Sequence, residues 1–462
     1  MSLVKIAWRS IQQRSLSSAL TGLSMALGVS LVVAVLVIYG VVENHFRRGA
    51  QGYNLIVGAK GGKLQLVMNT VYHLSQPVEN IPYSFYKEFT QGQFAAYTQL
   101  AIPLCMGDSY PSHGQTFRVV GTTPDLFDKI EYGRTRAGQP LKYAFQSGGR
   151  NFKHENFYEA VIGSVAAHVT GLNVGDTFQP THGIVESAAD VTTHEAFTIV
   201  GVLEPTGTPN DRGMFVNMEG FYLLEGHAKS APKEEADAVG EKKAETEHNE
   251  TAAPEKPAVE SAKPAEAQHD QAHHTPLPEN QREVTSILVL SSDIYAQVLA
   301  NTINEGNVAQ AVFPSREIAE FFDTWLGGLE YILLLFAGMI VVVAGIGVMV
   351  SIYNSISDRR HEIAVMRALG ASQSTVLLVV LLESILLSVL GGIAGILLGH
   401  GVIGLFSTYV VQQTGVTINP FQFDRGELIL IPALIVLASL VGLVPARAAY
   451  KTDVAKALGS TP

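Results

Sequence analysis

A cluster of glycine and lysine residues near the N-terminus is the first candidate for chemistry. The stretch "IVGAKGGKLQL", residues 56–66, opens on an apolar run, as a phosphate-binding loop would. Such a loop needs four residues between its first Gly and the Gly-Lys pair, and then a Ser or Thr for Mg²⁺. Here three residues separate Gly58 from Gly62, and Leu64 follows Lys63. We therefore expect no nucleotide site, and interpret the stretch as a turn beside a strand, whose glycines supply backbone angles that other residues resist.

A histidine-rich segment is the second candidate, for metal binding. Residues 229–282 contain no Phe, Trp, Tyr or Ile, and 12 acidic against 7 basic residues. Because such a composition buries too little apolar surface to offset the entropy of ordering, we predict a disordered insertion. The histidines in or beside it are His227, His248, His269, His273 and His274. Imidazole and carboxylate groups suit Zn²⁺, so weak zinc binding is one hypothesis; a solvated linker with incidental histidines is the other.

Two ionisable residues lie inside an otherwise apolar stretch. Glu383 and His400 would be costly within a membrane, which makes them functional candidates. Glu383 is about two turns from the end of the stretch, so it could instead reach a polar partner or the interface. In the same stretch Gly391, Gly395 and Gly399 recur every fourth residue and leave a smooth helix face for close packing. The sequence leaves open whether the packing partner is in the same chain or in a second subunit.

The composition points to a membrane protein. Of 462 residues, 47% are hydrophobic and 16% charged, and the mean hydropathy of +0.21 is too high for an ordinary soluble protein of this length. The apolar residues form four blocks, at about 16–39, 331–353, 376–406 and 428–444. Each approaches or exceeds the ~20 residues that cross a bilayer. The first block is longer than a signal-peptide core and no Ala-x-Ala site follows it, so we expect a retained helix.

The distribution of Lys and Arg predicts the orientation of these helices. Near the helix ends, nine basic residues fall on one side: Lys5, Arg9, Arg14, Arg359, Arg360, Arg367, Arg447, Lys451 and Lys456. The other side has only Arg47, Arg48, Arg316 and Arg425. Since basic residues stay cytoplasmic, both termini and the 355–375 loop are predicted inside, and residues 41–330 outside. The glycine-rich stretch 56–66 would then lie where ATP is effectively absent.

The external region has the pattern of an α+β domain. Residues 116–127, 197–206 and 284–292 read as short β-rich runs bounded by turn-forming residues, whereas 161–172 has helical spacing and a terminating glycine. Cys105 is the only cysteine, so no disulfide can form within the domain and its core must hold it together.

The predicted cytoplasmic loop "SDRRHEIAVMRALGAS", residues 357–372, is the most informative segment. Asp358 can cap a helix, and Ile363, Met366 and Leu369 recur at three-residue spacing before Gly370 ends it. The result would be a short amphipathic helix along the membrane that displays basic groups. It could anchor the chain to the surface, or it could dock a cytoplasmic partner.

The chain resembles the permeases of MacB-type ABC transporters, which include the lipoprotein-releasing permeases and the FtsX division proteins. The motifs that carry this resemblance are "AWRSIQQRSLSSALTGLSMALGVSLVVAV" (7–35), "RRHEIAVMRALGAS" (359–372), "ESILLSVLGGIAGILLG" (383–399) and "PARAAYKTDVAKAL" (445–458). Looser motifs at 161–178 and 197–224 are similar to that family's periplasmic core domain. Val454 stands where many relatives carry Pro.

The resemblance implies an α-helical membrane protein with four transmembrane helices and a large α+β extracytoplasmic domain between the first and second. The expected organisation is an amphipathic N-terminal helix (1–15), transmembrane helix 1 (16–40), the periplasmic core domain (41–314) with the insertion 229–282, a stalk helix (315–330), transmembrane helix 2 (331–356), the coupling helix (357–372), transmembrane helix 3 (374–407), an extracytoplasmic loop (408–426), transmembrane helix 4 (427–445) and a cytoplasmic tail (446–462).

The resemblance also implies a permease in the inner membrane of a bacterium that is not itself an enzyme and binds no cofactor. ATP and Mg²⁺ would bind a separate cytoplasmic ABC ATPase, contacted through Arg359, Arg360, Glu362, Met366 and Arg367. The permease would work as a homo- or heterodimer and transmit ATP-driven motion mechanically, acting on lipid-linked, peptide or other hydrophobic cargo. Further implied partners are membrane lipid and a periplasmic adaptor, lipoprotein or binding protein, and no nucleic acid.

Two alternatives stay open at this stage. The chain could be a non-transporting, FtsX-like transmitter that regulates a periplasmic enzyme or scaffold, or part of a zinc-linked envelope system that uses the histidine-rich insertion.

Overall fold

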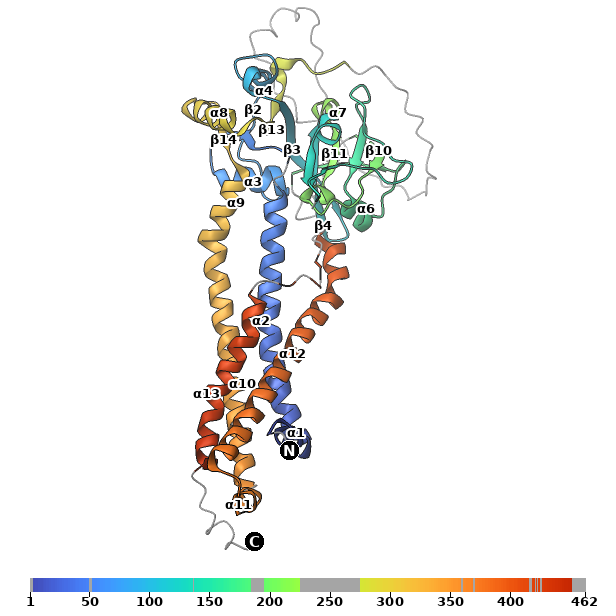
Figure 1. Cartoon of the computed structure of the whole chain (residues 1–462). Helices are drawn as coiled ribbons and strands as arrows, with labels where there is room; N and C mark the ends of the chain where they lie inside the picture. The colour runs from blue at the N-terminus through green and yellow to red at the C-terminus, as the bar shows by residue number, and fades with distance from the viewer. Residues whose placement is uncertain are drawn as a thin grey trace, which may run out of the picture.

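The molecule is a long helical bundle that carries an α+β domain at one end (Figure 1). The computed structural model describes residues 3–49, 52–135, 137–183, 195–224, 275–358, 360–368, 370–414, 418–419, 421, 423 and 426–450. Four of the helices in this part of the chain are long and apolar enough to cross a membrane. The first precedes the α+β domain and the other three follow it, which confirms the predicted fold class.

The four long helices of the bundle are longer than the predicted spans. The bundle consists of α1 (Leu3–Gln13), α2 (Ser15–Gly49), α10 (Gly327–Asp358), α11 (Arg360–Ala368), α12 (Gln373–Thr414) and α13 (Glu427–Tyr450), of which α1 and α11 are short. Helix α2 continues nine residues beyond the predicted end at 40, and α12 seven beyond 407. Hydropathy marks only the part of a helix that contacts lipid, whereas the backbone hydrogen bonds that define it continue into water.

The predicted stalk is continuous with the second spanning helix. It consists of α9 (Pro314–Phe321), which begins with proline at its first position, and a π-helical segment η5 (Phe322–Leu326) that leads directly into α10. Proline is suited to that position because its missing N–H would be unpaired there in any residue. The boundary between the stalk and the membrane helix is therefore a change of helical winding and not a loop.

The α+β domain is built on one large mixed sheet. The order of its described strands is β14-β1-β13-β3-β4-β11-β7-β10-β8, with β9 paired to β3. The strands are β1 (Leu55–Gly58), β3 (Leu100–Ser112), β4 (Gln115–Thr122), β7 (Glu159–Ile162), β8 (Thr177–Phe178), β9 (Thr181–His182), β10 (Phe197–Val202), β11 (Met214–Asn217), β13 (Ser286–Leu290) and β14 (Gln310–Val312). Two further strand pairs are β2 (Ile81–Pro82) with β12 (Glu283–Val284), and β5 (Glu131–Arg134) with β6 (Pro140–Lys142).

The two ends of the domain sequence share one sheet. Strand β1, which follows α2, lies between β13 and β14, which precede the stalk, and is antiparallel to both. The chain therefore enters and leaves the domain through adjacent strands. This arrangement places α2 and α9 side by side beneath the domain (Figure 1).

Both faces of the sheet are covered, so the domain has two apolar layers. Along β1, Leu55 and Val57 belong to one buried cluster and Ile56 to the other, as expected from the alternation of side chains in a strand. The covering helices are α3 (Lys63–Tyr72), α4 (Tyr83–Thr90), α5 (Asp125–Asp128), α6 (Ser164–Thr170), α7 (Met218–Leu223) and α8 (Asp293–Glu305). Of the predicted helix 161–172, residues 161 and 162 belong to β7 instead, and Gly171 ends α6 with φ of 76°.

The glycine-rich stretch is the turn between β1 and α3, but the reason we predicted for its glycines is wrong. None of Gly58, Gly61 and Gly62 has a positive φ. Space decides instead: a β-carbon on Gly58 would lie 2.6 Å from Leu66 Cδ1 and 3.2 Å from the carbonyl oxygen of Thr285. Glycine leaves room here for Leu66 of α3 to pack directly on the strand.

The predicted insertion ends earlier than residue 282. Residues 275–282 are ordered against the domain. Leu277 packs on the buried cluster that contains Leu55 and Val57, and Arg282 is buried. The Arg282 guanidinium donates to Glu219 Oε1 (2.9 Å) and to the carbonyl oxygen of Leu277 (2.6 Å), and lies 5.5 Å from the rings of Tyr83 and Tyr222. The prediction missed this anchor, formed by Leu277 and Arg282, because it was based on the average composition of the whole segment. Residues 225–274, with the remainder of the predicted insertion, lie outside the described residues.

We predict that Arg282→Leu destabilises the domain by about 3–5 kcal/mol, because it leaves the buried carboxylate of Glu219 unpaired. Arg282→Leu combined with Glu219→Leu should recover most of the loss. The matched control is Lys87→Leu, which breaks the exposed Lys87–Glu279 pair (2.7 Å) and should cost less than about 1 kcal/mol. Denaturant unfolding of the full chain in detergent measures all three; equal losses for Arg282 and Lys87 would contradict the anchor.

Candidate functional site: coupling helix, helix packing and stalk junction

The predicted coupling helix is α11, at the end of the bundle farthest from the α+β domain (Figure 1). Ile363 and Ala364 are buried, and Ile363 and Met366 pack into the apolar core of the bundle. Gly370, with φ of 101°, ends the helix as predicted, since its N–H and that of Ala371 bond back to the carbonyls of Arg367 and Met366. One face of α11 is thus fixed to the bundle.

The polar face of α11 is only partly visible. Arg367 is half-buried and has an interaction partner in the chain. The side chains of Arg360 and Glu362, and the whole of Arg359, lie outside the described part of the structure, as does the side chain of Asp358, the last residue of α10. Their proposed contacts with an ATPase stay predictions.

The three spaced glycines of α12 face α2 of the same chain. A β-carbon on Gly391 would lie 2.9 Å from Met25 Cβ, and one on Gly399 2.9 Å from Val33 Cγ1. At Gly395 it would lie 2.6 Å from the carbonyl oxygen of Ala26. Only glycine permits this approach, because nearly every real β-carbon keeps farther from such atoms. The sequence left open whether the partner of these glycines lies in the same chain or in a second subunit. The structure shows a partner in the same chain, α2.

We predict that Gly395→Ala destabilises the bundle by about 1–3 kcal/mol, since the added methyl group overfills the contact with α2. Gly401→Ala is the matched control: it lies on the same helix, a β-carbon there meets nothing within 4 Å, and alanine favours helix by about 1 kcal/mol. Thermal unfolding in detergent should lower the midpoint for Gly395→Ala and leave it equal or higher for Gly401→Ala. Equal midpoints would refute the packing role.

Glu383 lies inside the bundle together with buried serines. It is 7% exposed and is not a free carboxylate. The neighbouring Ser384 donates to the carbonyl oxygens of Leu381 (2.8 Å) and Ala438 (3.2 Å), which joins α12 to α13. Gly442 makes room for that serine, because a β-carbon there would lie 2.2 Å from its Oγ. These contacts fit a packing role, and a transport role for Glu383 stays a prediction.

His400 pairs with a residue that the sequence analysis missed. Its Nε2 lies 2.9 Å from Glu427 Oε2, and the two side chains are 11% and 4% exposed. The His400 ring also lies 4.7 Å from that of Phe423. Glu427 is the first residue of α13, at the boundary of the span. The sequence analysis missed it because a carboxylate is common at the start of a helix, where it interacts favourably with the helix dipole. The pair fastens α12 to the extracytoplasmic end of α13.

An aromatic cluster, which we call the stalk junction, connects the stalk to the α+β domain. Its members are Tyr39 and Phe46 of α2, Tyr72 of α3 and Phe322 of η5. Phe322 is 1% exposed, and its ring centroid lies 6.3 Å from Tyr39 and 5.7 Å from Phe46. The Tyr72 hydroxyl donates to the carbonyl oxygen of Phe46. The sequence analysis missed this junction, since only the fold brings residues 39–46 and 322 together.

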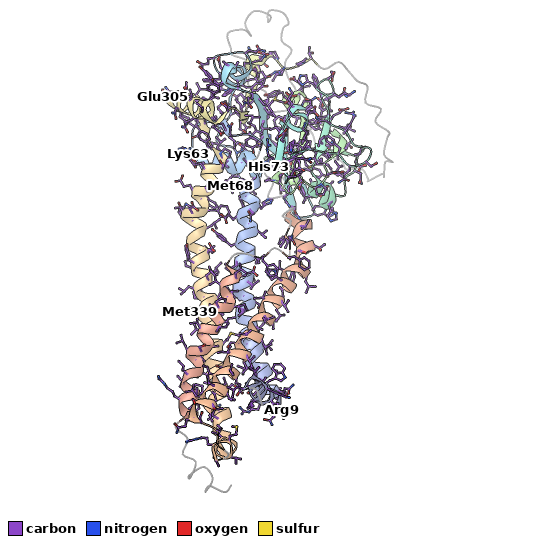
Figure 2. The ribbon with its side chains drawn as sticks, viewed as in Figure 1. Arg9, Lys63, Met68, His73, Glu305 and Met339 are labelled. Atoms are coloured by element: carbon purple, nitrogen blue, oxygen red, sulfur yellow. The ribbon has the colours of Figure 1, made fainter. Side chains whose placement is uncertain are left out.

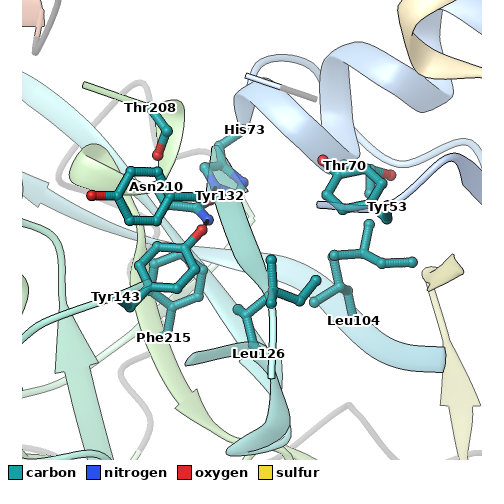
Figure 3. A pocket seen from close by; sticks show the side chains of 12 residues that line it. Tyr53, Thr70, His73, Leu104, Leu126, Tyr132, Tyr143, Thr208, Asn210 and Phe215 are labelled. Atoms are coloured by element: carbon teal, nitrogen blue, oxygen red, sulfur yellow. Dashed lines mark hydrogen bonds between the residues drawn. The ribbon is translucent and has the colours of Figure 1, made fainter. Parts of the chain in front are cut away.

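A small cavity lies behind α3, within the domain (Figure 3). Its volume is about 20 Å³, enough for roughly one water molecule and far too small for a cargo. His73, in a left-handed conformation (φ 57°), places Nε2 3.1 Å from Asn210 Oδ1, and the Asn210 amide donates to the Tyr143 hydroxyl (2.6 Å). His73 Nδ1 and Thr70 Oγ1 are buried without a hydrogen-bond partner among the described residues. The cavity thus joins α3 to the loop before β11 through polar groups.

Burial determines the protonation states at this cavity. It lowers the pKa of His73 to about 4, with a smaller opposing effect of the hydrogen bond to Asn210 and a further lowering by the Arg118 guanidinium. Burial also raises the pKa values of Tyr53 and Tyr143. The imidazole and both phenols are therefore neutral near pH 7, as an enclosed site requires.

We predict that acid destabilises the domain through His73. A histidine whose pKa is about 4 when folded and about 6.5 when unfolded contributes stability above pH 6.5 that is lost as the pH falls toward 4. Between about pH 7.5 and pH 5 the chain should lose about 2 kcal/mol more than His73→Asn, which keeps a residue tolerant of the left-handed conformation. Denaturant titrations at both pH values measure this, and identical losses would refute it.

The histidines of the histidine-rich segment are the predicted metal ligands. His227, His248, His269, His273 and His274 all lie outside the described residues. Within the part that is described, no group of three or more His, Cys, Asp or Glu side chains could hold a metal ion. Zinc binding by these histidines stays a prediction.

Comparisons with known proteins match both parts of the chain. Residues 18–244 match the model of the MacB-like periplasmic core domain, and residues 334–454 match that of the FtsX-like permease C-terminal domain. These two matches follow the order of helices and domain described above. The chain belongs to the MacB/FtsX-like family of ABC transporter permeases, and is a multi-pass membrane protein with a large extracytoplasmic domain.

Individual relatives are similar over shorter stretches. The macrolide export ATP-binding/permease protein MacB of Burkholderia cenocepacia is 37% identical over 131 residues, which are 28% of this chain and 18% of that protein. The ABC transporter permease YtrF of Bacillus subtilis is 32% identical over 136 residues, 27% of this chain and 31% of YtrF. A solved permease domain from Porphyromonas gingivalis matches 57% of this chain and 89% of its own, at 12% identity and a TM-score of 0.26, too low for the folds to be compared. The chain thus spans less than a third of the length of either relative.

Proposed function

We propose that this chain is the permease subunit of a MacB-type transporter in which a separate cytoplasmic ABC ATPase drives movements of the extracytoplasmic domain. The observation that carries the proposal is an unbroken helical connection from the cytoplasm to the domain core. It runs from the far end of α10, beside α11, through η5 into α9, and Phe322 of η5 is buried in the same apolar cluster as residues of α2 and α3. A force applied at one end has a stiff route to the other.

The physical argument rests on where this connection is rigid and where it can bend. Helix α10 is 32 residues long, about 48 Å at 1.5 Å per residue, so it can carry displacement across a ~30 Å hydrocarbon layer. The π-helical winding at 322–326 is a rare helical form that is frequently found at functional sites. Gly327 and Gly328 follow it directly and add backbone freedom. Motion of α10 would tilt α9, and with it β14 and β1 of the sheet.

The cargo would be moved by this lever and not through a pore. The polar cavity of the domain has room for roughly one water molecule, so a cargo would not bind there and would instead contact an outer surface. Lipid-linked, peptide or other hydrophobic molecules in the envelope fit a machine that pulls from outside. The name of the Burkholderia relative, an export protein with an ATP-binding part, supports ATP-driven export.

The assembly we propose has both termini of this chain in the cytoplasm of a bacterium, a permease dimer in the inner membrane, and ATP with Mg²⁺ bound by the ATPase. The ATPase would dock on α11, one apolar face of which is already packed inside the bundle, and the basic residues of this helix would supply the polar contacts. A fixed short helix with an outward polar face is a suitable docking element, because binding then orders few groups.

We predict that reversing the charges of Arg359, Arg360 and Arg367 to Glu removes an ABC ATPase that otherwise copurifies with the full chain in detergent. The loss should exceed about 100-fold, since like-charge contacts at a docking site cost several kcal/mol. The matched control reverses three cations of the extracytoplasmic domain, Lys129, Arg134 and Lys142, and should keep the ATPase. Quantitative mass spectrometry measures both. An ATPase retained by the α11 variant, or absent from the wild-type chain, would contradict the proposal.

The same complex separates transport from regulation. Reconstituted in liposomes, a transporter should release a lipid or lipoprotein only when ATP is present. Release of no cargo, together with ATP-dependent activation of an extracytoplasmic enzyme that copurifies, would favour the FtsX-like transmitter.

A further inference from the structure

An apolar groove opens at the cytoplasmic end of the bundle, between α1, α2 and α12. It has a volume of about 490 Å³, within the range of small-molecule sites, and its walls are almost wholly apolar. Trp8 and Ile11 of α1, Leu23 of α2, and Leu387 and Leu390 of α12 form these walls. This groove is separate from α11, the stalk junction and the polar cavity of the domain.

Small residues create the depth of the groove. Gly22 and Ala26 of α2 and Gly391 and Ala394 of α12 line it where the two helices are closest. Along α2 the lining residues extend from Ser15 to Ala26, about 17 Å at 1.5 Å per residue. One leaflet of a ~30 Å hydrocarbon layer has about the same depth. The groove therefore reaches from the cytoplasmic membrane surface to about the middle of the bilayer.

The helix that forms one wall of the groove, α1, is positively charged. Lys5 and Arg9 are exposed on α1 on either side of Trp8, with Lys5 one helical turn from it, and Figure 2 places Arg9 at the cytoplasmic end of the bundle. The first 42 residues contain Lys5, Arg9 and Arg14 and no acidic residue. Helix α1 is held in place by Ala7, Ser10 and Ile11, which are buried where it packs on α12. The helix that carries both cations is thus fixed beside the apolar slot.

We propose that this groove binds one anionic glycerophospholipid of the cytoplasmic leaflet, with an acyl chain in the slot and the phosphate at Lys5 and Arg9. An apolar slot one leaflet deep beside two cations matches both halves of such a lipid. Trp8, at the boundary between them, occupies the interfacial position that tryptophan prefers. Lys and Arg near the surface attract anionic headgroups, and each should favour an anionic over a zwitterionic lipid about fivefold. The bound lipid would seal the contact of α1, α2 and α12.

The chain provides its own reporter for a test, because Trp8 and Trp325 are its two tryptophans. In Trp325→Phe, only Trp8 fluoresces. The full chain is reconstituted into phosphatidylcholine vesicles containing a minor fraction of phosphatidylglycerol, with bromine quenchers on the acyl chains of one lipid or the other. Quenching of Trp8 reports which lipid occupies the groove. The preference for phosphatidylglycerol over phosphatidylcholine should be about fivefold if one cation contributes and about thirtyfold if both do.

Three variants define the outcome. Lys5→Gln with Arg9→Gln should reduce the preference to about one, whereas Ala394→Phe should weaken quenching by filling the slot while both charges remain. The matched control moves the reporter to lipid-exposed Val436 of α13, eleven residues from Arg447, as Val436→Trp with Trp8→Phe and Trp325→Phe, and should show no preference. Equal quenching by both lipids at Trp8 would overturn the proposal. Protection of Trp8 from both lipids would also overturn it, because a second copy of the chain would then cover the groove.

Discussion

The close packing of α12 on α2 is the constraint on which the rest of the molecule depends. Inside a bilayer, apolar side chains gain nothing by leaving lipid, so helices associate only where their surfaces fit closely. Gly391, Gly395 and Gly399 supply that fit by letting α12 approach the backbone of α2. Helix α12 in turn holds α1 and α13, and its far end reaches α6 of the domain. Its position therefore decides where the groove and the coupling helix lie.

A second set of contacts converts this bundle into a connected device. Phe322 fills a space between α2 and α3, so the stalk is joined to the domain by apolar packing that tolerates little displacement. Phe322 is also the first residue of the π-helical segment that interrupts the regular helix. The buried Phe322 ring ties the stalk to the domain, so the two should move together. The less regular helix that begins at this residue is where the connection to α10 can bend. This combination gives the proposed lever its mechanical basis.

Polar contacts refine the geometry at both ends of the spans. The His400–Glu427 pair holds α13 against α12 near the extracytoplasmic surface, and Ser384 joins the same helices deeper in the membrane. In the domain, the buried Arg282–Glu219 pair fixes the point at which the chain resumes after residue 274. Each pair is buried, so its loss would leave an unpaired polar group in a medium that solvates it poorly.

The sequence by itself determined the class of the molecule: the number of spanning helices, their order around the α+β domain, and Gly370 as the end of α11. These follow from hydropathy, helix spacing and turn chemistry, which are local properties. Only the tertiary structure decided which helix the glycines of α12 face, that Glu427 is the partner of His400, and that Phe322 meets Tyr39. It also corrected the end of the insertion and the reason for Gly58. Such contacts join residues far apart along the chain, and local patterns contain no information about which of many chemically equivalent partners the packed fold brings together.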